Sequence, residues 1–107
     1  MNIITNDKDK LALAIIALKE VDDPEIGLNV VDLGLIYQVD FDIDDKTIYC
    51  TMTLTTQFCP MGQSISDSVS NALERCFEDY SIEVKVIFDP PWNSQLISEE
   101  GREFLNR

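Results

Sequence analysis

The sequence predicts an α+β protein in which helices cover one face of a small mixed three-stranded sheet, as a two-layer sandwich. Two observations lead to this prediction. Three segments alternate apolar and polar residues, as half-buried strands do, and two longer segments repeat apolar residues at helical spacing. The predicted order is helix, strand, strand, helix, strand, helix. A sheet and a helix each have one apolar face to bury, and stacking them in two layers buries both.

The first helix is predicted to begin at Asp7, a favourable capping residue, and to end just before Pro24. The residue before a proline is pushed away from helical backbone angles, so the helix stops at Asp22-Asp23-Pro24. A loop over residues 24–34 follows. The apolar stripe of this helix consists of Leu11, Ala14, Ile15, Leu18 and Val21.

Two strands joined by a turn are predicted after the loop. Residues 35–43 alternate in polarity, residues 44–46 form the turn, and residues 48–54 form the returning strand. The inward-facing positions of the returning strand are Ile48, Cys50, Met52 and Leu54. The opposite face carries Tyr49, Thr51, Thr53 and Thr55.

The second half of the chain adds a helix over residues 60–78, a strand over residues 82–88 and a short helix through Leu105. Pro60 is favourable as a first helical residue, and Ser98 is a suitable cap for the last helix. The buried stripe of the longer helix is predicted to be Ile65, Val69, Ala72, Leu73 and Cys76. No linker or repeat divides the chain, so residues 1–107 are predicted to form a single domain.

The composition excludes several classes of function. The chain has 20 acidic and 8 basic residues and a net charge of −12. Nucleic-acid binding relies on a basic face, so we expect neither a nucleic-acid partner nor binding to an anionic membrane surface. The longest apolar run, residues 11–18, is shorter than the roughly 20 residues that span a bilayer. There is no histidine for acid–base catalysis or metal binding.

The three cysteines lie in different kinds of position. Their odd number and unpaired spacing favour a reducing compartment, so we expect a cytoplasmic location. Cys50 and Cys76 are in phase with buried stripes and are predicted to pack as small apolar residues. Cys59 follows the strand and directly precedes Pro60, beside the unpaired amides of a helix N-terminus, which lower the pKa of a thiol. Cys59 is therefore either a reactive thiol or a packing residue at the helix start.

Polar residues in the neighbouring loops could converge on Cys59. These candidates are Asp22, Asp23, Glu25, Asp32, Thr55 and Thr56. Most also have a structural explanation, because aspartates and threonines commonly hold turns and strand ends. Glu25 caps nothing obvious. A thiolate with one or two carboxylates is a partial ligand set for iron or zinc, and a cation would offset the repulsion between these groups.

Four motifs, in this order and spacing, resemble the SufT/PaaD-type metal–sulfur cluster assembly family. They are Asp23 to Ile26, Val31 to Tyr37, Met52 to Thr56 with Cys59-Pro60, and Asp89 to Trp92, and Ser98 to Arg102 is similar to the family's tail. The resemblance implies an α+β fold, a homodimer, and a role in maturing iron–sulfur proteins. It places the reactive cysteine at Cys59 and the supporting loop residues at Asp23, Glu25, Asp32 and Thr55.

The chain departs from the family pattern in two places. Gln57-Phe58 stands where the family often has small residues before the cysteine, which leaves the local turn uncertain. No cysteine follows Cys76, whereas the PaaD branch typically adds a cysteine-rich segment, so the stand-alone SufT-like branch is favoured. The chain also lacks the glycine-rich phosphate loop of the fused ATPase carriers that resemble this domain.

The resulting hypothesis is a non-enzymatic accessory factor that serves Fe–S assembly proteins and client apoproteins through Cys59. It would hold a labile Fe–S cluster or iron between subunits, with Glu25 as a second candidate metal ligand. An Fe–S cluster normally has four thiolate ligands, and one chain supplies a single suitable thiolate, that of Cys59. A two-fold dimer would supply two Cys59 thiolates, and small thiols or the recipient would complete a set weak enough for transfer.

Two alternatives remain open. The first is a metal-free docking module, in which the acidic surface and Pro90-Pro91-Trp92 recruit assembly machinery or clients. Trp92 would then be an interface anchor rather than a cover for the end of the sheet. The second is a thiol enzyme with Cys59 as nucleophile, for which the missing histidine leaves only carboxylates as the base.

Overall fold

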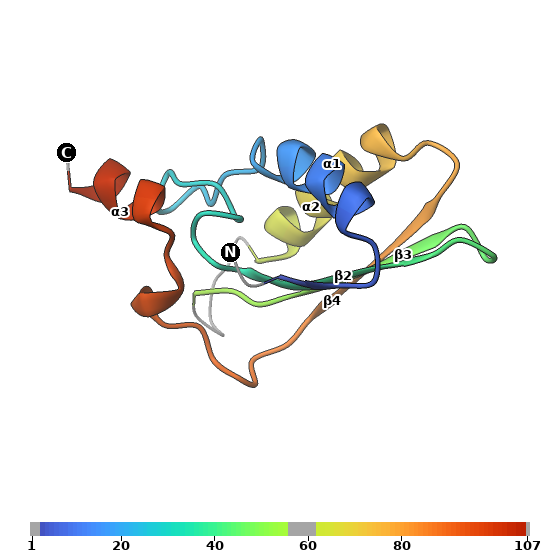
Figure 1. Cartoon of the computed structure of the whole chain (residues 1–107). Helices are drawn as coiled ribbons and strands as arrows, with labels where there is room; N and C mark the ends of the chain where they lie inside the picture. The colour runs from blue at the N-terminus through green and yellow to red at the C-terminus, as the bar shows by residue number, and fades with distance from the viewer. Residues whose placement is uncertain (1–2, 56–61, 107) are drawn as a thin grey trace.

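The structure is a computed structural model that describes residues 3–55 and 62–106. Two helices, α1 (Lys8–Leu18) and α2 (Gly62–Cys76), cover one face of a mixed sheet (Figure 1). The strands are β1 (Ile4–Thr5), β2 (Ile36–Asp42), β3 (Thr47–Met52) and β4 (Ser81–Val86), in the order β1-β2-β3-β4. β2 and β3 are antiparallel, whereas β1 and β4 run parallel to their neighbours. The predicted α+β class is confirmed.

The sheet has one strand more than the sequence predicts. β1 is only two residues long, too short to show any alternation of polarity. Next to it, the side chain of Asn6 bonds both backbone groups of Phe41, with its amide nitrogen 2.9 Å from the carbonyl oxygen and its own oxygen 2.9 Å from the amide nitrogen. This contact between residues distant in sequence holds the chain against β2.

The first helix is capped as predicted but ends earlier. The side chain of Asp7 accepts a hydrogen bond from the amide of Lys10 at 3.1 Å. α1 ends at Leu18, so the prediction that the helix continues to Asp22 was wrong. The carbonyl of Val21 accepts from the amide of Val30, and Asp22 forms a bridge with Asn29, so these residues turn back on themselves instead of continuing the helix.

The second helix buries its predicted stripe except at its last residue. Ile65, Val69, Ala72 and Leu73 are all buried. Cys76 is exposed, and the prediction that it packs in the core was wrong. Its sulfur lies 3.7 Å from the carbonyl oxygen of Leu13, at the rim between α1 and α2, where the helical layer meets solvent.

The β2–β3 hairpin has the predicted inner face, with two exceptions at its ends. Ile48, Cys50, Met52 and Leu54 are buried. Thr53 was predicted on the outer face but is fully buried, because regular pairing ends at Met52 and the amide of Thr53 donates to Leu35 at 2.8 Å. Ile43 lies in the turn and is exposed rather than facing inward.

The C-terminal part crosses the end of the sheet and finishes in α3 (Glu99–Leu105). A short 3-10 helix (Ser94–Leu96) comes first, and Ser98 caps α3 as predicted by accepting from the amide of Gly101 at 3.0 Å. Figure 1 shows α3 beyond the end of the sheet at which β2 begins. Within residues 3–55 and 62–106, no helix combines the length and the apolar character that crossing a bilayer requires.

The helical layer depends on the buried leucine of α2. Replacing Leu73, which is fully buried, with alanine should lower the free energy of unfolding by about 2–5 kcal/mol, because it removes apolar contacts and leaves a cavity. The matched control is Leu13→Ala on α1, where the side chain is 54% exposed. Urea unfolding measures both variants, and an equal loss in the two would contradict the packing described.

Candidate functional site

The described part of the candidate site lies at the end of the sheet where β2 begins and β3 ends. Thr55 is half-buried in a bend after β3, and α2 starts at Gly62. Thr56 and Cys59 lie outside the described residues. The amide of Thr53 bonds to Leu35, which brings the exit of β3 next to the loop that leads into β2. The described part of the site is therefore this loop and the segments that contact it.

Asp23 holds a tight turn within the loop. Its side chain is only 1% exposed and accepts from the amide of Glu25 at 2.9 Å. Its own amide donates to Leu28 at 2.9 Å, and its carbonyl accepts from Gly27 at 2.7 Å. Gly27 has a φ of +81°, a left-handed conformation that favours glycine. The structural explanation thus applies to Asp23, while Glu25 lies exposed on the outside of the same turn.

Asp32 joins the loop to the C-terminal segment. One carboxylate oxygen accepts from the side-chain amide of Asn29 at 2.7 Å, and the other accepts from the hydroxyl of Ser98 at 2.8 Å. The backbone carbonyl of Asp32 also accepts from the amide of Ser98 at 2.8 Å. Asp32 is 8% exposed, so these bonds form in a largely dry environment. The side chain that caps α3 is the same one that binds Asp32.

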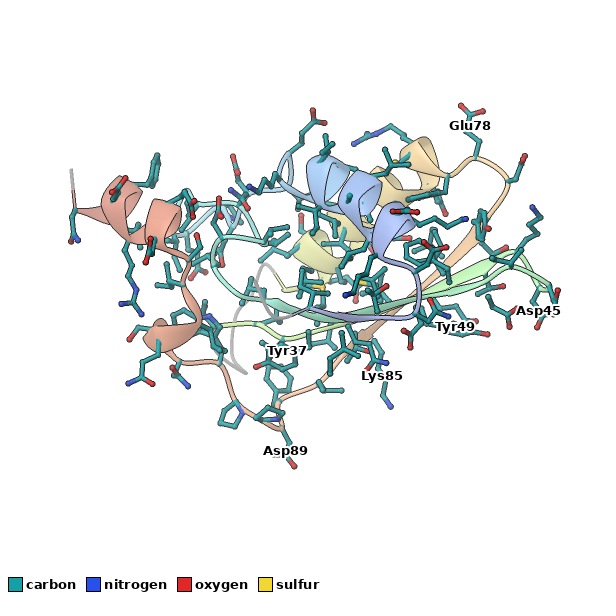
Figure 2. The ribbon with its side chains drawn as sticks, viewed as in Figure 1. Tyr37, Asp45, Tyr49, Glu78, Lys85 and Asp89 are labelled. Atoms are coloured by element: carbon teal, nitrogen blue, oxygen red, sulfur yellow. The ribbon has the colours of Figure 1, made fainter. Side chains whose placement is uncertain are left out.

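Three further contacts hold the C-terminal segment against the start of β2. The indole N–H of Trp92 donates to the carbonyl of Leu33 at 2.6 Å, and the hydroxyl of Tyr37 donates to the carbonyl of Pro90 at 2.9 Å. Gly34 has a φ of +80°, and any side chain there would overlap the backbone of Leu96. Figure 2 shows Tyr37 pointing away from the helices toward the segment that carries Asp89. Trp92 therefore covers the end of the sheet.

These contacts were missed from the sequence, although their residues lie in its motifs. The motif around Asp32 and the motif around Trp92 are far apart along the chain, and no local pattern pairs them. The signals that could have suggested the pairing are Gly34 and Gly101. A Cβ at Gly101 would come within 2.9 Å of Leu28 and 3.2 Å of the carbonyl oxygen of Asp32, which indicates close approach of two segments.

The two described thiols, Cys50 and Cys76, lack the lowered pKa that is predicted for Cys59. Burial raises the pKa of Cys50 to about 12, so this thiol stays protonated at neutral pH. Desolvation also raises the pKa of Cys76, although the residue is exposed as a whole. Cys76 ends the fifteen-residue α2, so it lies about 21 Å along the helix from Gly62. Neither thiol belongs to the end of the sheet at Thr55.

The described carboxylates do not form a metal centre by themselves. No group of three or more cysteine, aspartate or glutamate side chains that could hold a metal ion occurs among residues 3–55 and 62–106. Asp23 and Asp32 both accept hydrogen bonds from within the protein, in two separate networks. Of the acidic candidates, Asp23 and Asp32 are buried, whereas Asp22 and Glu25 are exposed.

Comparisons with known proteins give a consistent result. Residues 14–86 match the family described as iron–sulfur cluster assembly protein. The chain is 44% identical over 86 residues to the Fe–S protein maturation auxiliary factor YitW of Bacillus subtilis, covering 80% of this chain and 83% of that one. It is 41% identical over 82 residues to the auxiliary factor SufT of Staphylococcus aureus, covering 75% and 90%. A crystal structure of a DUF59 domain of unknown function from Bacillus anthracis has a TM-score of 0.83 and 34% identity, with 90% of each chain covered.

The junction at Asp32 can be tested by hydrogen exchange. Asp32→Ala removes the acceptor of the Asn29 and Ser98 side chains, so the amides of Ser98 and Gly101 should exchange roughly thirtyfold faster or more, for a local loss of about 2 kcal/mol. Amides in β3 should keep their protection. Asp44→Ala, in the exposed β2–β3 turn, is the matched control. Unchanged exchange at Ser98 in Asp32→Ala would show that the carboxylate does not hold this segment.

Proposed function

Since the chain belongs to the iron–sulfur cluster assembly protein family, we propose that it is an accessory factor in the maturation of iron–sulfur proteins and that it acts through Cys59. The observation that supports this most strongly is the agreement of the family match with relatives named Fe–S protein maturation auxiliary factors, over most of the chain. The cargo is an Fe–S cluster or its iron, and the recipients are client apoproteins.

The assignment to Cys59 rests on its place in the motif and on the state of the other two thiols. Cys50 is buried with a raised pKa, which makes it a poor ligand and a poor nucleophile at neutral pH. Cys76 lies at the far end of α2. Cys59 directly precedes the proline that is predicted to begin α2, where helix amides would stabilise its thiolate.

The ligand set that we propose is incomplete within one chain. Cys59 supplies one thiolate, and Glu25, exposed beside the buried Asp23, is the candidate second ligand. Asp23 and Asp32 are committed to holding the loop, so their role is to position it. The remaining ligands come from outside the chain, from a second copy, small thiols or the recipient. Fewer bonds to the protein favour release of the cargo to a client.

Several further features belong to the same proposal. We propose that the protein is a homodimer, that it works with Fe–S assembly proteins, and that it is not an enzyme, as the word auxiliary in the names of its relatives suggests. A cytoplasmic location fits the unpaired Cys50 and Cys76. The metal-free docking module remains the second candidate. The net charge of −12 favours it, because an acidic surface can recruit a basic partner.

The test compares two single thiol replacements. Cys59→Ser should abolish the gain in client enzyme activity that the protein provides in cells, because the serine hydroxyl cannot replace the thiolate. Cys76→Ser, at the exposed thiol at the end of α2, should keep that gain. Equal client activity with Cys59→Ser and with the native protein would contradict the proposal.

Anaerobic reconstitution with iron and sulfide separates the carrier from the docking module. A carrier should develop thiolate-to-iron absorption in the visible range that Cys59→Ser lacks. A docking module should stay colourless in both forms and still bind its partner.

A further inference from the structure

The outer edge of β4 is open and carries a symmetric order of charged side chains. β4 is the last strand of the sheet, and no strand of the described residues lies along its outer side. The other edge is formed by β1, which has only two residues. β4 offers six, and its side chains alternate between exposed and half-buried along the strand. An open edge of this length can accept another strand.

The backbone groups that face outward are fixed by the pairing with β3. The amides of Ser81 and Ile87 donate to carbonyls on the β3 side, at 2.7 and 2.8 Å. Because neighbouring residues of a strand direct their backbone groups to opposite sides, Ile82, Val84 and Val86 direct theirs outward. These three residues are spaced symmetrically about Val84.

The charges on β4 are also symmetric about Val84, with opposite signs. Glu83 and Lys85 flank Val84, are exposed, and lie on the face of the sheet away from the helices, next to Tyr49 and Thr51 of β3. Figure 2 shows Lys85 and Tyr49 on that face. The chain has 20 acidic residues and only 8 basic ones, so Lys85 is one of the few positive charges that could attract an acidic side chain of a second strand.

We propose that β4 pairs antiparallel with β4 of a second copy about a two-fold axis at Val84. In this register Val84 lies opposite Val84 of the second copy, Ile82 lies opposite Val86, and these pairs exchange six hydrogen bonds in total. Glu83 lies opposite Lys85 of the second copy, twice, with side chains at close range. If the two-fold axis lay one residue away, at Glu83 or at Lys85, Glu83 would lie opposite Glu83 or Lys85 opposite Lys85. Charge therefore selects one register.

The pairing extends the sheet into the second copy and leaves the helices of both copies on one side. It also sets where the two β3 strands end. β3 leaves the sheet beside the C-terminal end of β4, and these ends point in opposite directions in an antiparallel pair. The two Met52 positions are then about 20 Å apart, from four residues of strand and three strand spacings. This pairing gives an interface to the proposed homodimer, and in that respect it rests on the proposed function.

Sedimentation equilibrium of the full chain tests the pairing. The native protein should be a dimer. Lys85→Glu should weaken dimerisation roughly tenfold to a hundredfold, because two attractive cross-strand pairs become repulsive. Glu83→Lys combined with Lys85→Glu should restore the native affinity, since the pairs are only exchanged. Lys8→Glu makes the same change of charge at the exposed start of α1 and should leave dimerisation unchanged.

A cross-linking experiment fixes the register. Cys50 is the neighbour of Val84 on β3, so the background is Cys50→Ala, Cys59→Ser and Cys76→Ser. In it, Val84→Cys should form an intermolecular disulfide, because the Cα atoms of directly opposed residues in a hydrogen-bonded pair are about 5.5 Å apart, within disulfide range. Ile82→Cys should not cross-link to itself, since it faces Val86 of the second copy. A monomeric native protein overturns the proposal and would leave the edge open for a strand of a different partner. A dimer whose affinity is unchanged by Lys85→Glu also overturns it. Neither result depends on the role of Cys59.

Discussion

The arrangement around the candidate site depends on the carboxylate of Asp32. It binds Asn29 within its own loop and Ser98 from the start of the last helix, and it is nearly inaccessible to water. A buried carboxylate left without these partners would be costly, so the loop and the C-terminal segment stabilise each other. Trp92 and Tyr37 extend the same junction across the start of β2. The end of the sheet at which β3 ends is thus built from the loop before β2 and the C-terminal segment.

This construction separates two roles within the acidic motifs. Asp23 and Asp32 shape the loop, because their oxygens are occupied by hydrogen bonds inside the protein. Glu25 is carried on the surface of the turn that Asp23 holds. A protein that hands on its cargo benefits from a rigid scaffold with few ligands of its own, because each additional bond to the cargo slows its release. The proposed homodimer adds to this scaffold by pairing the two copies at β4.

Sequence periodicity predicted the elements that repeat often enough to show a phase, such as β3 and α2. It missed β1, which has two residues and depends on Asn6 bonding Phe41, 35 residues away. Cys76 shares the helical phase of Leu73 but lies at the exposed rim between α1 and α2. Helical phase did not reveal this position, because it does not show where the neighbouring helix ends. The motifs identified Asp23 and Asp32 as important. They could not show that Ser98, 66 residues after Asp32, is its partner, since only the folded chain brings the two together.

The central claim is that Cys59 is an accessible thiol that loses its proton easily. The most direct test is the rate of alkylation of each cysteine against pH, followed by mass spectrometry of the native protein. Cys76 is the internal reference, because desolvation raises its pKa. Our account predicts that alkylation of Cys59 reaches half its maximal rate at a lower pH than alkylation of Cys76. Half-maximal alkylation of Cys59 at the same pH or higher, or reaction only after unfolding, would contradict the account.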